Sequence, residues 1–171
     1  MKTIDIEIAI IKHFNPRQNI IVPNVSWGLS NKEYKALHEC DILILSKTGY
    51  ATEIEIKVSK GDLLKDGDKR HGHTHNLIRR FYFAVPGELK EIALESIPAT
   101  AGLLVVENYE KVIYIPYGGS KIIPAVRVRH IREPQTNTKA VKWTDEQRYQ
   151  LTRLGTMRIL GLKEKIQRLT R

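Results

Sequence analysis

The sequence predicts an α/β fold, because strand-like segments alternate along the chain with segments of helical periodicity. The strand-like runs lie at residues 40–45, 51–58, 80–85 and 101–107, and the helical segments lie at 61–70 and 87–97. The run 101–107 is almost entirely apolar, which is typical of a strand buried on both faces. A length of 171 residues and a hydrophobic content of 42% suit a single domain with a sizeable core.

The N-terminal segments are less clear from pattern alone. Residues 3–14 fit both the alternation of a strand and the spacing of a helix. Residues 19–25 have an extended pattern in which Pro23 indicates an edge strand or a turn, because proline cannot donate a backbone hydrogen bond. Further along, Ser59 is a suitable cap for the helix expected at 61–70.

The C-terminal third is expected to add a strand, a connector and a basic helix. The alternating pattern of the strand puts Arg127 and Arg129 on one of its faces. The last segment begins with Thr144 as a cap and continues as one amphipathic helix, or as two helices broken at Gly155 or Gly161. The predicted organisation is a core at residues 1–133, a polar and flexible connector at 134–143, and a basic helix or helical pair at 144–171.

A β-hairpin at residues 40–58 gathers charged side chains on one face. Lys47, Thr48 and Gly49 supply the turn, with glycine where a positive φ costs little. Because successive strand residues point to opposite faces, three charged residues share one side and three apolar residues face the core. The charged residues are Glu53, Glu55 and Lys57, and the apolar ones are Ile54, Ile56 and Val58.

The register of this hairpin predicts a metal site. A turn centred on Thr48 sets Asp41 opposite Glu55, whereas a slip of one residue would move Asp41 to the apolar face. Opposed residues have Cβ atoms about 5 Å apart, so the two carboxylates repel unless a cation lies between them. Hard oxygen ligands suit Mg²⁺ or Mn²⁺. Taken alone, however, an E-x-E-x-K strand is more typical of a solvated antiparallel face.

Asp41 followed by Glu55-Ile56-Lys57 resembles the D…(D/E)xK signature of the PD-(D/E)XK, or restriction-endonuclease-like, nuclease superfamily. The later segments EIKVSKGDLLKD, FYFAVP and IPATAGLLVVE are similar to its branch of MmcB-like DNA-repair proteins and phage or mobile-element proteins. The resemblance covers about residues 1–116, and Cys40 stands where the family pattern often has proline. It implies a restriction-endonuclease-like core, a central mixed β-sheet flanked by helices, and it favours a helix at residues 3–14.

The resemblance also implies roles for individual residues. Asp41 and Glu55 would hold Mg²⁺, with Mn²⁺ as a substitute, and the main-chain carbonyl of Ile56 would assist them. Lys57 would orient or activate the attacking water and stabilise the charge that develops on the phosphate. Further acids that could take part are Glu7 on the first helix, Glu39, and Glu53, which would support the ligands or face solvent.

The charge distribution favours a nucleic-acid partner. The formal net charge is +9 and the pI is about 9.7, as expected of a protein that meets phosphate backbones. Charge alone leaves RNA and membrane surfaces open, but the family resemblance points to DNA. The residues expected to contact DNA lie after the hairpin and are Lys60, Lys65, Lys69, Arg70, His71 and Arg79.

Three alternating histidines, His71, His73 and His75, raise the question of a zinc site. They lie on a polar segment without a neighbouring cysteine, which favours solvated or phosphate-contacting side chains over a closed tetrahedral site. Cys40, the single cysteine, allows no internal disulfide, which fits a reducing compartment. No apolar run approaches the roughly 20 residues that span a bilayer, and the first ten residues include acids, so a cytoplasmic protein that does not enter membranes is expected.

The function expected from the sequence is a Mg²⁺-dependent endonuclease or exonuclease that hydrolyses phosphodiester bonds in DNA. The resemblance associates it with DNA repair, recombination or mobile elements. One alternative is a non-catalytic DNA-binding or repair scaffold protein that keeps the nuclease fold, and another is an enzyme that acts on RNA. A homodimer through the basic C-terminal helix is a further expectation, by analogy with other helical interfaces.

Overall fold

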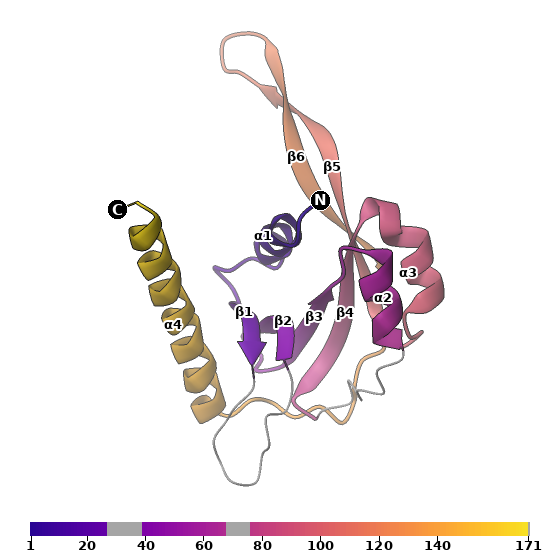
Figure 1. Cartoon of the computed structure of the whole chain (residues 1–171), viewed down its shortest axis with the longest axis vertical. Helices are drawn as coiled ribbons and strands as arrows, with labels where there is room; N and C mark the ends of the chain where they lie inside the picture. Colours follow the sequence, from indigo (N-terminus) through magenta and orange to yellow (C-terminus); the bar gives the residue numbers. More distant parts are fainter. Residues whose placement is uncertain (27–38, 68–75, 171) are drawn as a thin grey trace. The chain divides into compact units, whose positions relative to one another are not determined.

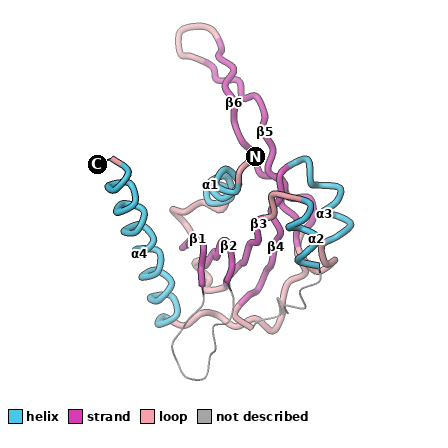
Figure 2. Tube along the Cα trace, viewed as in Figure 1, coloured by secondary structure: helices cyan, strands magenta, loops and turns pink. Residues whose placement is uncertain are grey.

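The computed structural model describes residues 1–26, 39–67 and 76–170, and these form an α/β fold with a six-stranded mixed sheet, flanking helices and a long C-terminal helix (Figures 1 and 2). The helices are α1 (Thr3–His13), α2 (Lys60–Gly67), the 3₁₀ turn η1 (Gly87–Leu89), α3 (Lys90–Ser96) and α4 (Asp145–Leu169). The strands are β1 (Ile20–Ser26), β2 (Glu39–Leu45), β3 (Ala51–Ile56), β4 (Ile78–Pro86), β5 (Gly102–Tyr114) and β6 (Ser120–Arg132), and they lie in this order across the sheet. The predicted fold class is confirmed.

The chain divides into two compact units, each made of three separate segments. The first unit comprises Met1–His13, Ile56–His71 and Tyr82–Gln135. The second unit comprises Phe14–Glu55, Gly72–Phe81 and Thr136–Arg171. Each unit therefore depends on contacts between residues that are far apart in the sequence.

The second unit is built around an apolar cluster beneath the β1–β2–β3 meander. The strands are antiparallel, and Pro23 lies on β1 at the edge of the sheet, where its missing N–H group does not interrupt a central ladder. Trp143 is buried in this cluster, and its indole N–H donates to the carbonyl oxygen of Leu77 at 2.9 Å. The buried members of the cluster are Val22, Val25, Cys40, Leu43, Leu45, Ala51, Ile78, Trp143 and Leu151.

Helix α4 packs on β1 through its N-terminal half. Thr144 and Gln147 form the capping box at its start, which confirms the predicted cap. The helix continues unbroken through both glycines, so the version with two helices is wrong. At Gly155 an added Cβ would lie 3.4 Å from Cγ2 of Val22, which is within van der Waals contact, so the helix lies close to β1 at this residue. Among the described residues, no helix is long and apolar enough to cross a membrane.

The segment expected to be a flexible connector is tied down by hydrogen bonds instead. The backbone N–H of Asn137 donates to the carbonyl of Arg79 at 2.9 Å, and its side-chain amide donates to the carbonyl of Ile78 at 3.0 Å. Further along, the N–H of Val141 donates to the carbonyl of Asn76 at 2.8 Å. The polar composition of this segment predicted a flexible connector. The sequence does not show that distant backbone carbonyls accept its hydrogen bonds.

The first unit contains the parallel pair β4–β5, to which helices and a long hairpin are attached. Gly102 at the start of β5 lies against the ring of Tyr82, where a Cβ would collide with ring carbons. Helix α2 begins after Ser59, whose hydroxyl accepts from the N–H of Asp62 at 3.2 Å, as predicted. Helix α1 is confirmed as a helix, with Ile6 and Ile10 fully buried.

Strands β5 and β6 form a hairpin of two 13-residue strands, here called the arm (Figure 1). The prediction for β5 ended near residue 107, but the strand continues to Tyr114 and pairs with β6 along its whole length. The turn uses positive φ at Tyr117, Gly118 and Gly119. The far end of the arm is exposed on both faces, so its strands lack the burial that the sequence argument relied on.

Candidate active site

The β2–β3 hairpin has the predicted register. Leu43 pairs with Glu53 and Ile42 pairs with Ile54, and one further step in this register sets Asp41 opposite Glu55. The turn closes through the N–H of Ser46, which donates to the carbonyl of Tyr50 at 3.1 Å. Gly49 has a φ of +86°, which fits the role expected for glycine in this turn. The two acids therefore lie at corresponding positions of neighbouring strands.

The charged face of β3 is not solvated, contrary to one reading of the alternation. Glu53 is only 2% exposed and Lys57 only 6%, while Ile54 and Ile56 on the opposite face are also buried. Paired residues of an antiparallel ladder share a face, so Glu53 lies on the same face as Leu43 of the apolar cluster. Both faces of this strand are covered, which alternation alone could not predict.

The candidate ligands differ in exposure and belong to different units. Asp41 and Glu55 are half-buried and lie in the second unit. Ile56 and Lys57 are buried and lie in the first unit, where the N–H of Lys57 donates to the carbonyl of Ala84 at 3.0 Å. The chain itself joins the two groups, because Glu55, Ile56 and Lys57 are consecutive residues.

The other predicted acids have different positions. Glu7 is half-buried on α1 in the first unit. Glu39 begins β2, and its side chain lies outside what the structure describes. Within residues 1–26, 39–67 and 76–170, no group of three or more His, Cys, Asp or Glu side chains could hold a metal ion. The ligand set implied by the resemblance, two carboxylates and a main-chain carbonyl, does not require such a group, and Mg²⁺ usually keeps several water ligands.

The predicted DNA-contacting residues fall into three groups. Lys60 and Lys65 are exposed on α2. The guanidinium of Arg79 stacks on the ring of Tyr50 at 4.0 Å from its centroid, and the ammonium of Lys142 lies 5.8 Å from the same centroid. The remaining predicted residues, Lys69, Arg70 and His71, lie outside the described residues, as do His73 and His75.

Two histidines that the sequence argument did not single out meet in the first unit. Nε2 of His13 lies 2.9 Å from Nε2 of His130, and Nδ1 of His130 lies 2.8 Å from a carboxylate oxygen of Glu133. The hydroxyl of Tyr82 donates to the other oxygen of Glu133 at 2.7 Å. Partial burial of the ring, and secondarily the neighbouring His130, lower the pKa of His13 below 6.5.

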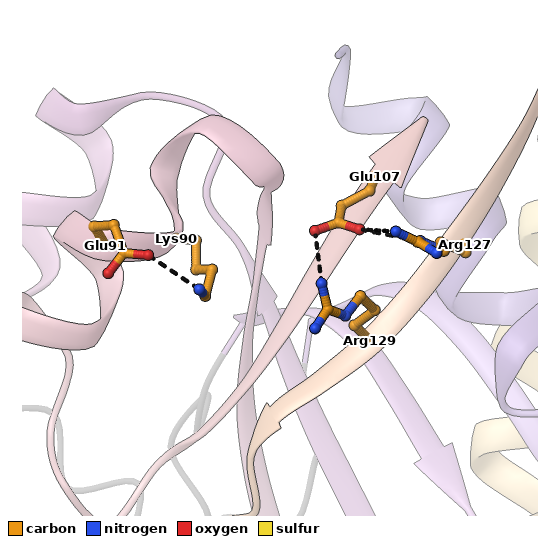
Figure 3. Close-up of polar contacts among 5 residues, drawn as sticks. All are labelled: Lys90, Glu91, Glu107, Arg127 and Arg129. Carbon is orange, nitrogen blue, oxygen red and sulfur yellow. Dashed lines mark hydrogen bonds and ion pairs between the residues drawn. The ribbon is translucent and has the colours of Figure 1, made fainter. Parts of the chain in front are cut away.

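Glu107 accepts from two arginines near the base of the arm (Figure 3). Nε of Arg127 donates to one carboxylate oxygen at 3.0 Å, and Nη1 of Arg129 donates to the other at 3.4 Å. The prediction that both arginines share a strand face is thereby confirmed. Their common partner Glu107 was not predicted, because the sequence does not reveal the register that pairs Glu107 with Arg127.

Comparison with known proteins supports the fold without assigning a family. No protein-family model matches the chain, and no curated protein matches it either. Among solved structures it is similar to the SPO1766 protein of unknown function from Silicibacter pomeroyi, with a TM-score of 0.58 and 17% sequence identity. The match covers 95% of this chain and 88% of that chain. The likeness is one of fold alone.

Proposed function

We propose that this protein is a metal-dependent deoxyribonuclease of the PD-(D/E)XK superfamily. The observation that carries the proposal is the hairpin register that sets Asp41 opposite Glu55, combined with the burial of Lys57 two residues further along the chain. The proposed activity is hydrolysis of phosphodiester bonds in DNA, in repair, recombination or mobile-element biology. The MmcB-like branch is the part of the superfamily that the sequence resembles most specifically.

The burial of Lys57 supports a role beyond solubility. Removing an ammonium group from water costs several kcal/mol unless charged or polar partners compensate. A lysine on a solvated strand face would extend its amine into water, whereas Lys57 is 6% exposed. A buried cation close in sequence to an acid is the arrangement expected where a lysine acts on a charged reactant.

The donor chemistry fits magnesium or manganese. Two carboxylates and a carbonyl are hard oxygen ligands, and a divalent cation would relieve the repulsion between Asp41 and Glu55. A bound Mg²⁺ would supply Lewis-acid stabilisation of the charge that develops on the phosphoryl oxygens. Asp41, Glu55 and the Ile56 carbonyl would hold it. Lys57 would orient the attacking water and place a compact positive charge beside the phosphate.

The runner-up is a non-catalytic DNA-binding or repair scaffold with the same fold. The observation in its favour is that no group of three or more His, Cys, Asp or Glu side chains among the described residues could hold a metal ion. Many metal-dependent nucleases add a third acid, so a pair of acids is also consistent with a site that has lost turnover. If the wild-type protein binds DNA but does not cut it under any metal condition, this alternative is supported.

The decisive experiment compares cleavage by wild type and by two substitutions of similar volume. Asp41→Asn removes a ligand charge, and Lys57→Met removes the ammonium while keeping an unbranched side chain in the buried position. Labelled single-stranded, duplex and branched DNA would be incubated with Mg²⁺, Mn²⁺ or EDTA. We expect metal-dependent cleavage by wild type and a loss of about a hundredfold or more in each variant.

A matched control is Lys139→Met, which removes an exposed lysine that is not among the predicted metal-site or DNA-contacting residues. This control should cut DNA nearly as well as wild type, and all variants should keep the wild-type circular dichroism spectrum. Equal cleavage by wild type, Asp41→Asn and Lys57→Met would refute the proposal, because the activity would then come from a contaminant or from another site.

A further inference from the structure

A groove in the first unit lies between α1 and the arm. Its volume is about 920 Å³, and the helix and the hairpin that border it lie side by side in Figure 1. On α1, the lining residues recur at the spacing of one helical face and are Asp5, Ile8, Ala9, Lys12 and His13. The groove is thus built by a continuous stripe of the helix.

Both strands of the arm line the same groove, and several of the lining side chains share one face. Lys111 pairs with Ile123 and Tyr109 pairs with Ala125, so these four side chains share a face. Arg127 belongs to the same face through its pairing with Glu107. The groove wall therefore combines apolar, aromatic and basic side chains in a fixed register.

The charges that line the groove favour an anionic ligand. Among its described lining residues, Lys12, Lys111 and Arg127 are cationic and Asp5 is anionic. The carboxylate of Asp5 accepts from the backbone N–H of Lys2 at 2.9 Å, which engages it at the start of α1. Both lysines are exposed, so their ammonium groups are available to phosphates.

The apolar part of the groove favours a ligand that also has flat, exposed rings. Ile8 is 44% exposed on α1, and Tyr109 is half-buried on the facing strand. The guanidinium carbon of Arg127 lies 5.5 Å from the centroid of the Tyr109 ring, and Glu107 holds Arg127 there. An aromatic ring with a fixed guanidinium beside it is a stacking platform for nucleobases.

We propose that this groove binds a single strand of nucleic acid, with phosphates on Lys12 and Lys111 and a base stacked on Tyr109. A single strand is favoured because its base faces are free to cover the apolar floor, whereas the bases of a duplex are stacked on one another. The inference rests on the proposed action on DNA. It adds the surface along which a single strand would bind.

The test is binding of a labelled oligothymidylate in EDTA, measured by fluorescence anisotropy at several salt concentrations. Lys12→Gln combined with Lys111→Gln should weaken binding, and the slope of log K against log salt should become shallower by roughly 0.7 for each lost phosphate contact. The matched control combines Lys90→Gln with Lys139→Gln and removes the same charge outside the groove. Equal losses in both double variants would overturn the inference, since only net charge would then matter.

A second pair of variants tests stacking. Tyr109→Ala should weaken binding to oligothymidylate by about tenfold and leave binding to an abasic oligonucleotide unchanged. Tyr114→Ala, on the opposite face of the same strand, should change neither. If Tyr109→Ala binds oligothymidylate as tightly as wild type does, stacking in the groove is refuted. If a mononucleotide binds as tightly as the oligomer, the groove binds a small ligand and the proposal of a single strand is overturned.

These outcomes are separable from those of the nuclease test. Because binding is measured without divalent metal, loss of catalysis in Asp41→Asn or Lys57→Met does not affect it. Groove variants that bind like wild type while wild type still cuts DNA would overturn the groove and leave the nuclease proposal intact. If the groove variants weaken binding but wild type shows no metal-dependent cleavage, the nuclease proposal would be overturned and binding in the groove would stand.

Discussion

At the scale of single residues, the sequence predicted which strand face carries Lys57 and Glu53, but it did not predict that both side chains are buried. The alternation of β3 correctly placed the Glu53 side chain away from Ile54, whose own burial was expected. It could not reveal that the charged face would also be covered, because alternation of charged and apolar residues normally marks one solvated face. Burial of the charged face depends on packing partners that are distant in the sequence.

His13 provides a prediction about pH. Its pKa lies below 6.5 in the folded protein because of partial burial and the neighbouring His130, so the unfolded state binds more protons below that pH. The free energy of unfolding should therefore decrease as the pH falls from about 7.5 through 6.5 toward 5. Urea unfolding of wild type and His13→Gln in EDTA would measure this, and the variant should show the smaller decrease.

The groups that surround His13 define the control for this experiment. His130 and Glu133 complete the hydrogen-bonded chain, and the Tyr82 hydroxyl donates to Glu133. Lys90→Gln changes a half-buried cation that is not part of this hydrogen-bonded group, and it should keep the pH dependence of wild type. Identical pH dependence in wild type and His13→Gln would show that the lowered pKa of His13 has no effect on stability.

Trp143 provides a prediction about the core of the second unit. Trp143→Phe removes the indole N–H that donates to the Leu77 carbonyl and leaves space beside the apolar cluster. The lost hydrogen bond and the smaller ring together cost about 1–3 kcal/mol. We expect the free energy of unfolding in urea to fall by that amount, whereas Tyr149→Phe, an exposed ring on α4, should change it little. An unchanged free energy of unfolding in Trp143→Phe would contradict this prediction.

At the scale of elements, the sequence predicted the helices and strands whose patterns lie within a short stretch of the chain. The β2–β3 hairpin was predicted with its register because the alternation and the glycine turn both lie within 20 residues. The distal part of β5 was missed because its residues beyond Glu107 lack a one-sided apolar pattern. Their strand structure depends on pairing with β6, which a local pattern cannot show.

Helix α4 gives a prediction at this scale. Leu151 is buried in the cluster, whereas all residues from Thr156 to Thr170 are exposed. Removing residues 161–171 should therefore lower the free energy of unfolding by less than about 1 kcal/mol, while Leu151→Ala should lower it by about 2–5 kcal/mol. Thermal and urea unfolding of the two variants would compare them. A truncated chain that fails to fold would show that the exposed half of α4 has a partner, such as a second copy in a homodimer.

At the scale of the whole molecule, the organisation differs from a simple division along the sequence. The sequence suggested a core, a connector and a terminal helix in succession, yet each compact unit collects three separate segments. Trp143 illustrates the cause, since its backbone N–H donates to Gly49 and its indole to Leu77. Composition marks the connector as polar but carries no information about which distant carbonyls accept its hydrogen bonds.

The part of the candidate site that lies within one hairpin could be predicted from the sequence. Asp41, Glu55 and Lys57 follow from one hairpin and a short motif, and the register of that hairpin agrees with the prediction. The groove beside the arm was not predicted, because its two walls are more than 90 residues apart in the sequence. Residues 3–14 fitted helical spacing in the sequence, but nothing in the sequence showed that this helix faces the arm.

The proposed nuclease activity is tested most directly by the DNA-cleavage assay with wild type, Asp41→Asn and Lys57→Met in Mg²⁺ and in EDTA. We expect wild type to cut DNA only when the metal is present, and each variant to lose about a hundredfold or more of this activity while remaining folded. Cleavage that is equal in all three proteins, or DNA binding by wild type without cleavage under any metal condition, would contradict it.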